Sequence, residues 1–439
     1  KTQHNEVAPA QHEMAPIYST ANIATDHNQL VMETMKKVAR RHNFECLLHE
    51  KPFAGVNGSG KHDNWSLVTN TGKNLLSPGK TPYDNKQFLL FLSAVIAAVD
   101  DNAALLRMSA SNPGNDHRLG ANEAPPAIIS IFLGEQLEDI VEQILQNGTA
   151  THSNKGERMD IGVHTIPPIK KDATDRNRTS PFAFTGNKFE FRMVASSMSI
   201  AGANTVLNAT VADVLQSMAD RMEKADDLDK TVDEIIYETL KEHQKVIFNG
   251  NGYSDEWIAE AEKRGLPNVK TMVDATASLL YPKTIEIFER QHVYTKTELE
   301  SRAEINYEAY AKAINIEAKT MIHMASKEYI PAIISYVTSL GDSINSISAA
   351  CAEADLSVQK DLLTTCSSLL AKAQTALYAL KDADKKANAM EEGKKQAEFF
   401  RDTVFTAMAD LRAPIDELEM IVDKEYWPVP SYGDMLFEV

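Results

Sequence analysis

Four acidic or imidazole side chains occupy settings that favour metal chemistry. Glu6 and Glu13 lie in the neutral strings His-Asn-Glu-Val-Ala and Gln-His-Glu-Met-Ala, and Glu190 lies between two phenylalanines. His62 directly follows a loop rich in glycine. Carboxylates with one imidazole make a hard, oxygen-rich site that suits Mg²⁺ or Mn²⁺ holding nucleotide phosphates. A single glutamate in such a setting is more often a solvated strand residue, so the hypothesis of a metal site rests on the combination of the four side chains.

The loop before His62 reads Asn57-Gly58-Ser59-Gly60-Lys61. Its glycines let the backbone approach a ligand closely, and a histidine after such a loop can direct a ring nitrogen into the same cavity. The segment matches neither the P-loop nor the dinucleotide fingerprint, because G-K-[ST] and G-x-G-x-x-G are both missing. A glycine-rich hairpin turn with a surface histidine is the alternative interpretation.

A strict two-residue alternation over residues 188–192 predicts a strand with its phenylalanines on one face. Lys188, Glu190 and Arg192 then share the other face, which suits a polyphosphate that carries divalent ions. A surface ion-pair ladder is the alternative. An interval of seven would place Glu6 and Glu13 on opposite faces of an unbroken strand, so their convergence requires a break, which we expect at Pro9.

These residues need a scaffold, and the chain changes character along its length. Residues 1–135 mix short strand-like runs with one apolar helix at about 86–107, and residues of about 136–180 form a polar stretch without a clear apolar period, as in a surface insertion. From about 205 the pattern is helical, with an a/d seam over 363–380. The sequence predicts an α+β region at 1–210 and a bundle of long helices for assembly at 211–439.

Composition excludes several function classes. The chain has 439 residues, and 62 acidic against 45 basic residues give a net charge of −17, which disfavours nucleic acid as a partner. Apolar runs such as 88–99 are too short to span a membrane. Three cysteines form no disulfide framework, so we expect a cytoplasmic location. The chain opens on Lys-Thr-Gln-His without a signal peptide, and we expect it to be a fragment.

Taken in order, five motifs resemble the catalytic domain of glutamine synthetase. They are Glu6 with Gln-His-Glu13, Lys51-Pro-Phe with Asn57-Gly-Ser-Gly-Lys-His62 and Ser66, Arg118 with Glu123-Ala-Pro, Asn177-Arg178, and Glu190-Phe-Arg192. The polar insertion and the helical C-terminal half are similar to the large bacterial type III branch. The resemblance implies a catalytic domain of antiparallel strands with flanking helices.

The resemblance also implies roles for single residues. Two or more Mg²⁺ or Mn²⁺ ions would be bound, one by Glu6 and Glu13 and another by His62 and Glu190. Substrate glutamate would contact Asn57, Gly58, Arg118 and Arg192. The nucleotide would lie along Ser66 and Lys188, Arg178 would stabilise the transferring phosphoryl group, and Glu123 would lie on a flap over the reacting centre.

The activity implied is ATP-dependent joining of ammonium to glutamate through a glutamyl phosphate, in a double-ring dodecamer. Phosphoryl transfer needs positioning and charge neutralisation, which fits two metal sites and several arginines. A ligase that joins glutamate to a polyamine or another amine is an alternative, as is a non-catalytic structural or regulatory relative. The family's earlier pair of metal-binding glutamates and its N-terminal domain have no counterpart in this chain.

Overall fold

The computed structural model describes most of the chain. The described residues are 3–7, 10–53, 55–120, 124–153, 158–159, 169–170, 177, 179–431 and 434. They form two compact units, residues 1–303 and 304–439. The boundary between the units lies well after the composition change near residue 205, and the functional division at residue 210 stays a prediction.

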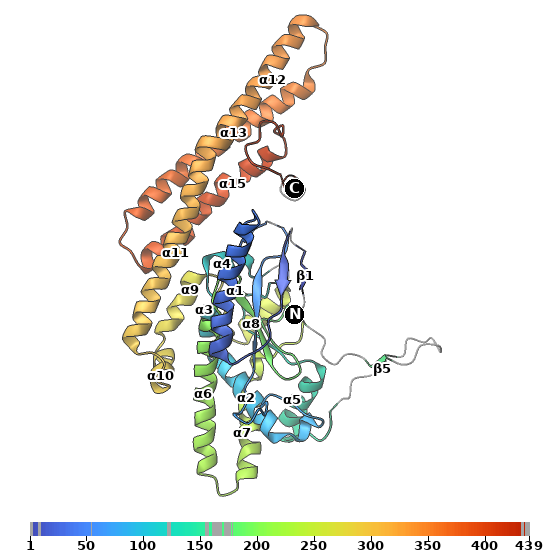
Figure 1. Ribbon diagram of the computed structural model, residues 1–439, viewed down its shortest axis with the longest axis vertical. Helices are drawn as coiled ribbons and strands as arrows, with labels where there is room; N and C mark the ends of the chain where they lie inside the picture. Colours follow the sequence, from blue (N-terminus) through green and yellow to red (C-terminus); the bar gives the residue numbers. More distant parts are fainter. Residues whose placement is uncertain are drawn as a thin grey trace. The chain divides into compact units, whose positions relative to one another are not determined.

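A four-stranded sheet forms the centre of the first unit (Figure 1). Its strand order is β3 (Gly60–Trp65), β8 (Phe189–Ala195), β7 (Phe182–Phe184) and β4 (Ile131–Phe132). β8 pairs antiparallel with both of its neighbours, whereas β4 pairs parallel with β7. The α+β class is confirmed, but the expectation of antiparallel strands is wrong for this last pair, so the sheet is mixed.

The predicted strand around residue 190 is β8. Every residue of β8 is buried, and its phenylalanines pack against those of β7 on the neighbouring strand. The rings of Phe182 and Phe189 stack with their centroids 4.7 Å apart, and Phe184 meets Phe189 edge-on at 5.2 Å. This aromatic layer fixes one face of β8 in the core and leaves the alternate side chains on the other face.

A separate hairpin lies at the start of the chain. β1 (Gln3–Asn5) pairs antiparallel with β2 (His12–Met14), with Asn5 opposite His12. The backbone N–H of Glu6 donates to the carbonyl oxygen of Gln11 at 3.0 Å and continues this register. The chain therefore reverses between the two strands, as the expected break required, although Pro9 itself lies outside the described residues.

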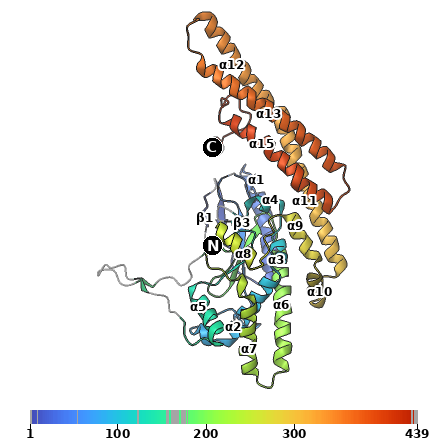
Figure 2. The same cartoon turned by 180° about the vertical axis from the view of Figure 1, so that it is seen from behind.

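Helices surround the sheet of the first unit (Figures 1 and 2). They are α1 (Ala21–Arg41), α2 (Lys86–Asp101), α3 (Ala103–Ser109), α4 (Pro113–Arg118), α5 (Glu135–Asn147), α6 (Ala201–Glu223), α7 (Leu228–His243), α8 (Asp255–Lys263), α9 (Met272–Thr276) and α10 (Pro282–Arg290). Two short strands, β5 (Arg158–Met159) and β6 (Ile169–Lys170), pair antiparallel in the predicted insertion.

The apolar helix expected at about 86–107 is two helices. α2 and α3 meet at Asn102 with a bend of 82°. Asn102 lies at the break, where its side chain donates to the carbonyl oxygen of Ala98 at 2.9 Å. Among the described helices, no single one is long and apolar enough to cross a membrane, and α2 with α3 passes that test only as a bent pair.

The predicted insertion begins with a regular helix. α5 buries Leu137, Ile140, Val141 and Ile144, which recur at a spacing of three or four residues. The interpretation of this part as lacking an apolar period was therefore wrong. Gly148 ends the helix in the left-handed conformation that favours glycine.

A buried ion pair anchors α4. Arg107 is 1% exposed, and its Nη2 lies 3.2 Å from Oδ1 of Asp116. Asp116 also accepts the backbone N–H of Met272 at 2.8 Å, so the pair ties α4 to the start of α9. Burial lowers the pKa of Arg107 and raises that of Asp116 to about 6, and in each case the partner's charge opposes the shift.

The second unit is a bundle of long helices. It contains the later part of α11 (Lys296–Met324), α12 (Ile330–Ala350), α13 (Ser357–Asn388), α14 (Lys394–Phe399) and α15 (Phe405–Glu419). Two π-helical segments interrupt these helices, η4 (Ala325–Tyr329) before α12 and η5 (Phe400–Val404) before α15. Figure 1 shows α12 and α13 side by side, and α15 also packs on α13.

The predicted seam on α13 is largely confirmed. Cys366, Ala373, Leu377 and Leu380 are buried, as their 3,4 spacing requires. Leu369 takes the buried place that the pattern gave to the adjacent Leu370, which is half-buried.

Candidate functional site

His62 and Glu190 come together on one face of the sheet. They belong to the neighbouring strands β3 and β8, where Asn64 lies directly opposite Glu190. The register shifts between Lys61 and Asp63, so the ladder is irregular at His62 itself. Nδ1 of His62 lies 4.0 Å from Oε2 of Glu190, and the side chain of His62 is 54% exposed against 10% for Glu190. His62 and Glu190 are the two residues predicted to bind the second metal ion.

This separation fits a shared divalent ion. Two donor atoms that each lie about 2.1 Å from one ion are at most about 4.2 Å apart, so the pair needs only a small adjustment. Carboxylate oxygens are ligands that suit Mg²⁺ and Mn²⁺.

Arg192 is paired with Glu190. Its Nε and Nη2 donate to Oε2 of Glu190 at 3.2 and 3.0 Å, and Nη1 donates to the carbonyl oxygen of Asn177. The side chain of Arg192 is only 4% exposed. Glu190 and Arg192 therefore form a buried ion pair on their shared face. This arrangement resembles the alternative interpretation, an ion-pair ladder, more than an arginine that is free to bind a substrate carboxylate.

The hairpin brings Glu6 and Glu13 onto a common face. His4 lies opposite Glu13 and Asn5 opposite His12, so Glu6 follows opposite Gln11 and stands diagonal to Glu13. The side chain of Gln11 donates to the carbonyl oxygen of Gly58 at 3.2 Å, which ties the turn of the hairpin to the glycine-rich loop. The hairpin and the loop thus form one neighbourhood.

Two glycines of the loop make room for Arg118. A Cβ on Gly60 would lie 2.1 Å from Nη2 of Arg118, and one on Gly58 would lie 2.8 Å from its Cγ. Arg118 itself ends α4, is 5% exposed, and donates to Oδ1 of Asn115 at 2.9 Å and to the carbonyl oxygen of Arg192 at 3.1 Å. The glycines were expected to let the backbone approach a ligand, but here they let it approach the buried side chain of Arg118. That side chain lies against the loop and donates to β8.

Ser66 and Lys188 lie at the far end of the same two strands. The hydroxyl of Ser66 donates to the carbonyl oxygen of Asn187 and lies 3.0 Å from both that atom and Oδ1 of Asn74. Lys188 donates to the hydroxyl of Thr185 at 3.1 Å. The structure brings these two predicted nucleotide contacts together, because Ser66 directly after β3 bonds to the turn that contains Lys188.

Asn57 is half-buried in the loop. Glu123 and Arg178 lie outside the described residues, so their predicted roles rest on the resemblance alone.

Glu50 is a residue that the sequence interpretation missed. It directly precedes the lysine of the Lys-Pro-Phe motif and is 3% exposed. It lies between His49 and Lys51, so the criterion that singled out Glu6, Glu13 and Glu190, a carboxylate in neutral or apolar surroundings, does not find it. Lys61 was also overlooked, although its Nζ donates to the carbonyl oxygens of Ser196 and Met198 at 2.6 Å.

The electrostatics of this region are governed by burial. Burial lowers the pKa of Lys61 to about 8 and that of Arg118 to about 10, and the charge of Glu50 opposes both shifts. Burial raises the pKa of Asp63 to about 7, against a hydrogen bond from Asn204. A carboxyl group, a lysine and an arginine are thus held in the interior beside the face that carries His62.

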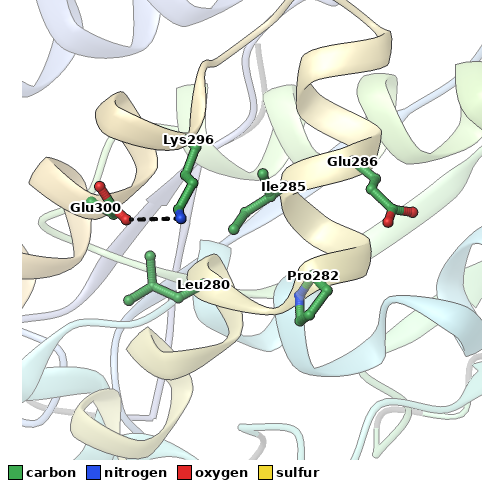
Figure 3. A pocket seen from close by; sticks show the side chains of 6 residues that line it. All are labelled: Leu280, Pro282, Ile285, Glu286, Lys296 and Glu300. Carbon is green, nitrogen blue, oxygen red and sulfur yellow. Dashed lines mark ion pairs between the residues drawn. The ribbon is translucent and has the colours of Figure 1, made fainter.

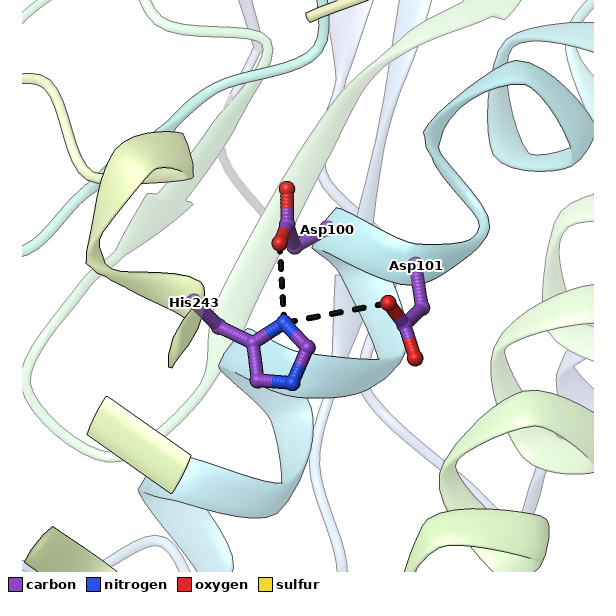
Figure 4. A group of neighbouring side chains, drawn as sticks. All are labelled: Asp100, Asp101 and His243. Atoms are coloured by element: carbon purple, nitrogen blue, oxygen red, sulfur yellow. Dashed lines mark hydrogen bonds and ion pairs between the residues drawn. The ribbon is translucent and has the colours of Figure 1, made fainter. Parts of the chain in front are cut away.

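A second acidic and imidazole cluster lies where α2 and α7 end (Figure 4). Nδ1 of His243 lies 2.8 Å from Oδ2 of Asp100 and 3.8 Å from Oδ1 of Asp101. Lys245 approaches Asp100 at 3.5 Å and Lys283 approaches Asp101 at 2.8 Å, so cations of the chain already compensate the carboxylates. Both helices end here, where the helix dipole favours positive charge. The cluster is a charge-balanced ion-pair network.

A pocket of about 530 Å³ lies elsewhere in the first unit (Figure 3). It is lined by Leu280, Pro282, Ile285, Glu286, Lys296 and Glu300. None of the predicted site residues lines it. An ion pair between Lys296 and Glu300 closes one side of it at 3.7 Å.

The chain is similar in sequence to known proteins. Residues 1–128 match the family model described as "Glutamine synthetase, catalytic domain", and residues 231–348 match "Glutamine synthetase C-terminal domain". The whole chain is 46% identical to a glutamine synthetase of Butyrivibrio fibrisolvens over 63% of that protein. The chain belongs to the glutamine synthetase family. The predicted resemblance is confirmed.

Two further glutamine synthetases align with the whole chain. The type-3 enzyme of Dictyostelium discoideum is 45% identical over 60% of its length, and the protein of Bacteroides fragilis is 41% identical over 61%. The chain thus spans about three fifths of the length of these relatives. A solved structure titled "Apo GmaS without ligand" aligns with 69% of the chain at a TM-score of 0.42 and 15% identity, which is too distant to carry an argument.

Proposed function

We propose that this chain supplies part of the active site of a glutamine synthetase, which joins ammonia to the side-chain carboxylate of glutamate at the expense of ATP. The observation that carries the proposal is the approach of His62 to Glu190 at 4.0 Å between the neighbouring strands β3 and β8. The relatives named above, which match the whole chain at 41–46% identity, support the same activity.

The reaction explains why the site consists of charges. A carboxylate is a poor electrophile, so an oxygen of the glutamate side chain first attacks the γ-phosphorus of ATP, and ADP leaves. Ammonia then attacks the acyl carbon of the resulting glutamyl phosphate, loses a proton, and phosphate leaves. Both steps need positioned counter-charges, and neither needs a nucleophilic residue of the protein.

Divalent metal ions would neutralise phosphate charge and orient the γ-phosphoryl group. His62 and Glu190 would hold one ion, and Glu6 with Glu13 would hold another. The choice between Mg²⁺ and Mn²⁺ is left to experiment.

The other residues bind and orient substrates in this proposal. Asn57 and the backbone of Gly58 would contact glutamate, and Ser66 with Lys188 would lie along ATP. Arg118 and Arg192 are already engaged with neighbouring chain atoms, so they would act on a substrate carboxylate only by exchanging part of these hydrogen bonds. Arg178 would face the transferring phosphoryl group.

Glu123 is proposed to cover the glutamyl phosphate and to accept a proton as the amine adds. Glu123→Ala should lower glutamine formation by about 10²–10⁴. Water would then reach the acyl phosphate, so phosphate release should exceed glutamine formation. A ratio that stays at one, with the parent's rate, would remove Glu123 from the mechanism.

The amine substrate is best tested directly. Full-length protein is supplied with ATP, glutamate, Mg²⁺ and either ammonium, methylamine or putrescine, and ADP and the amide product are measured. Ammonium as the preferred amine supports the proposal. Preference for putrescine or methylamine supports the related glutamate-amine ligase, and no turnover with any amine supports the non-catalytic relative.

Assembly and location complete the proposal. A double-ring dodecamer would give a particle of twelve copies, which light scattering of the full-length protein can weigh. The three cysteines are free, in keeping with the proposed cytoplasmic location.

A further inference from the structure

Glu50 joins three segments of the proposed site. Its backbone carbonyl oxygen accepts the N–H of Ser59 at 2.8 Å, which closes the glycine-rich loop. Its carboxylate Oε1 accepts the backbone N–H of Ser197 at 2.9 Å and is also bonded to the hydroxyl of that residue, just after β8. A Cβ on Gly114 of α4 would lie 2.2 Å from Oε2.

Each of these segments carries a proposed substrate or metal contact. The loop closed at Ser59 contains Gly58, the strand before Ser197 contains Glu190, and the helix that begins beside Gly114 ends at Arg118. A buried side chain that contacts all of them controls how these groups are spaced, although it touches none of the reacting atoms.

The charge of Glu50 matters as much as its shape. Arg118 is buried, and its hydrogen bonds to Asn115, Met193 and Arg192 all end on neutral oxygen atoms. Hydrogen bonds to neutral oxygens do not balance a buried guanidinium charge, which needs an anion nearby. Glu50 supplies a negative charge that acts on Arg118, since this charge raises the pKa of Arg118 against the effect of burial. The two residues are also neighbours, because the backbone oxygen of Glu50 and the stem of Arg118 both lie within 3 Å of the Cβ position of Gly58.

We propose that Glu50 is a positioning residue, which holds the charged Arg118 and the glycine-rich loop in place for the carboxylate of substrate glutamate. This inference rests on the proposed function. It predicts that loss of the Glu50 charge weakens glutamate binding selectively, since the proposed nucleotide contacts Ser66 and Lys188 lie at the other end of β3 and β8.

The test compares full-length parent protein with Glu50→Gln, which keeps a hydrogen-bond acceptor of the same size but removes the charge. The KM for glutamate should rise at least about tenfold, while the KM for ATP stays within about twofold. Ser197→Ala keeps the charge and should change the KM for glutamate much less. Glu45→Gln, at an exposed glutamate nearby, is the matched control.

Gly114→Ala provides a second route if Glu50→Gln folds poorly. The added methyl group would displace the carboxylate without altering its charge, and the same selective rise in KM for glutamate is expected. An unchanged KM in Glu50→Gln, or an equal rise for glutamate and ATP together with a lower melting temperature, would overturn the proposal and leave Glu50 as a structural residue.

Hydrogen exchange separates this inference from the proposed function. In Glu50→Gln, amides of residues 57–60 and 114–118 should exchange faster while those of α13 do not change. If the parent turns over no amine but Glu50→Gln still shows faster local exchange, the ligase activity is refuted and the positioning role is kept. Unchanged exchange together with unchanged KM values would refute the positioning role alone.

Discussion

The two units of the chain bury different kinds of side chain. In the described part of residues 1–303, the interior includes charged groups such as Glu50, Arg107 and Arg118. In the described part of residues 304–439, the buried side chains are apolar or aromatic except for the amide of Gln396. Burying charge costs desolvation energy, so the first unit gives up stability to place charges, whereas the second gains stability from packing.

Because of this contrast, we expect substitutions in the two units to have different effects. A substitution of a buried charged residue in the first unit should change catalytic activity, the pH dependence of stability, or both, because the buried charges interact with one another. A substitution in the bundle should act through packed volume alone. Four experiments test this difference.

Glu190→Gln should have the largest effect, because it removes the charge of the proposed metal ligand on β8 and also the anion that pairs with the buried Arg192. Even the outer partners of metal ligands are worth about 10–100-fold, so turnover should fall by more than about 100-fold. Turnover and nucleotide affinity are measured in full-length protein, with Glu417→Gln in the bundle as the control. Normal values for both in the Glu190 variant would sink the metal assignment.

Arg107→Met should cost about 3–5 kcal/mol of unfolding free energy, because it leaves Asp116 buried without its cation. Urea denaturation of the chain measures the loss. The matched substitution in the bundle is Arg412→Met, which breaks an exposed pair with Asp416 and should leave the urea midpoint within error. Equal effects of the two substitutions would contradict the contrast.

Leu377→Ala should destabilise the bundle by about 2–5 kcal/mol, since it opens a cavity in the buried seam of α13. The adjacent Tyr378 is 64% exposed, and Tyr378→Ala serves as the control. Thermal melting of the chain is the measurement. If the two variants melt together, the seam does not form the core of the bundle.

His243 should give the smallest effect, a pH-dependent one. Burial lowers its pKa, but the hydrogen bond to Asp100 and the charges of Asp101, Asp100 and Glu242 outweigh burial and raise it above 6.5. Its contribution to stability is therefore fully present below pH 6.5 and lost as pH rises through the folded-state pKa. Lys245 and Lys283 also face this cluster, because they pair with the two aspartates.

The comparison is between parent and His243→Gln, by urea denaturation at pH 6 and pH 8.5. The parent should lose more stability than the variant over this interval. The same loss in both proteins would show that His243 is not the titrating group.

Local patterns predicted the elements that one strand or one helix can define alone. The alternation at 188–192 gave β8, and the 3,4 spacing gave the seam of α13, because each pattern reflects a single buried face. The bend at Asn102 was missed, since the apolar character of α2 and α3 continues through it. α5 was missed because its apolar residues are separated by many charges.

The site was predictable in its residue types and less so in its arrangement. The resemblance named His62 and Glu190, and the register of β3 and β8 brings them together. Glu50 was missed because its importance arises from three segments that are distant in sequence. The sequence allowed two interpretations of Arg192, an ion pair with Glu190 on the same strand or a contact to the substrate carboxylate. No pattern within one strand decides between them.

The π-helical segments η4 and η5 bear on how the bundle tolerates changes of chain length. A π turn holds about one residue more than an α turn, so it absorbs an extra residue while the helices on both sides keep their faces. Pro331, the second residue of α12, has no N–H to donate, which removes one helical hydrogen bond where the wide turn lies. Residues 325–329 and 400–404 are accordingly places where related chains can gain or lose one residue while the flanking helices keep their packed faces.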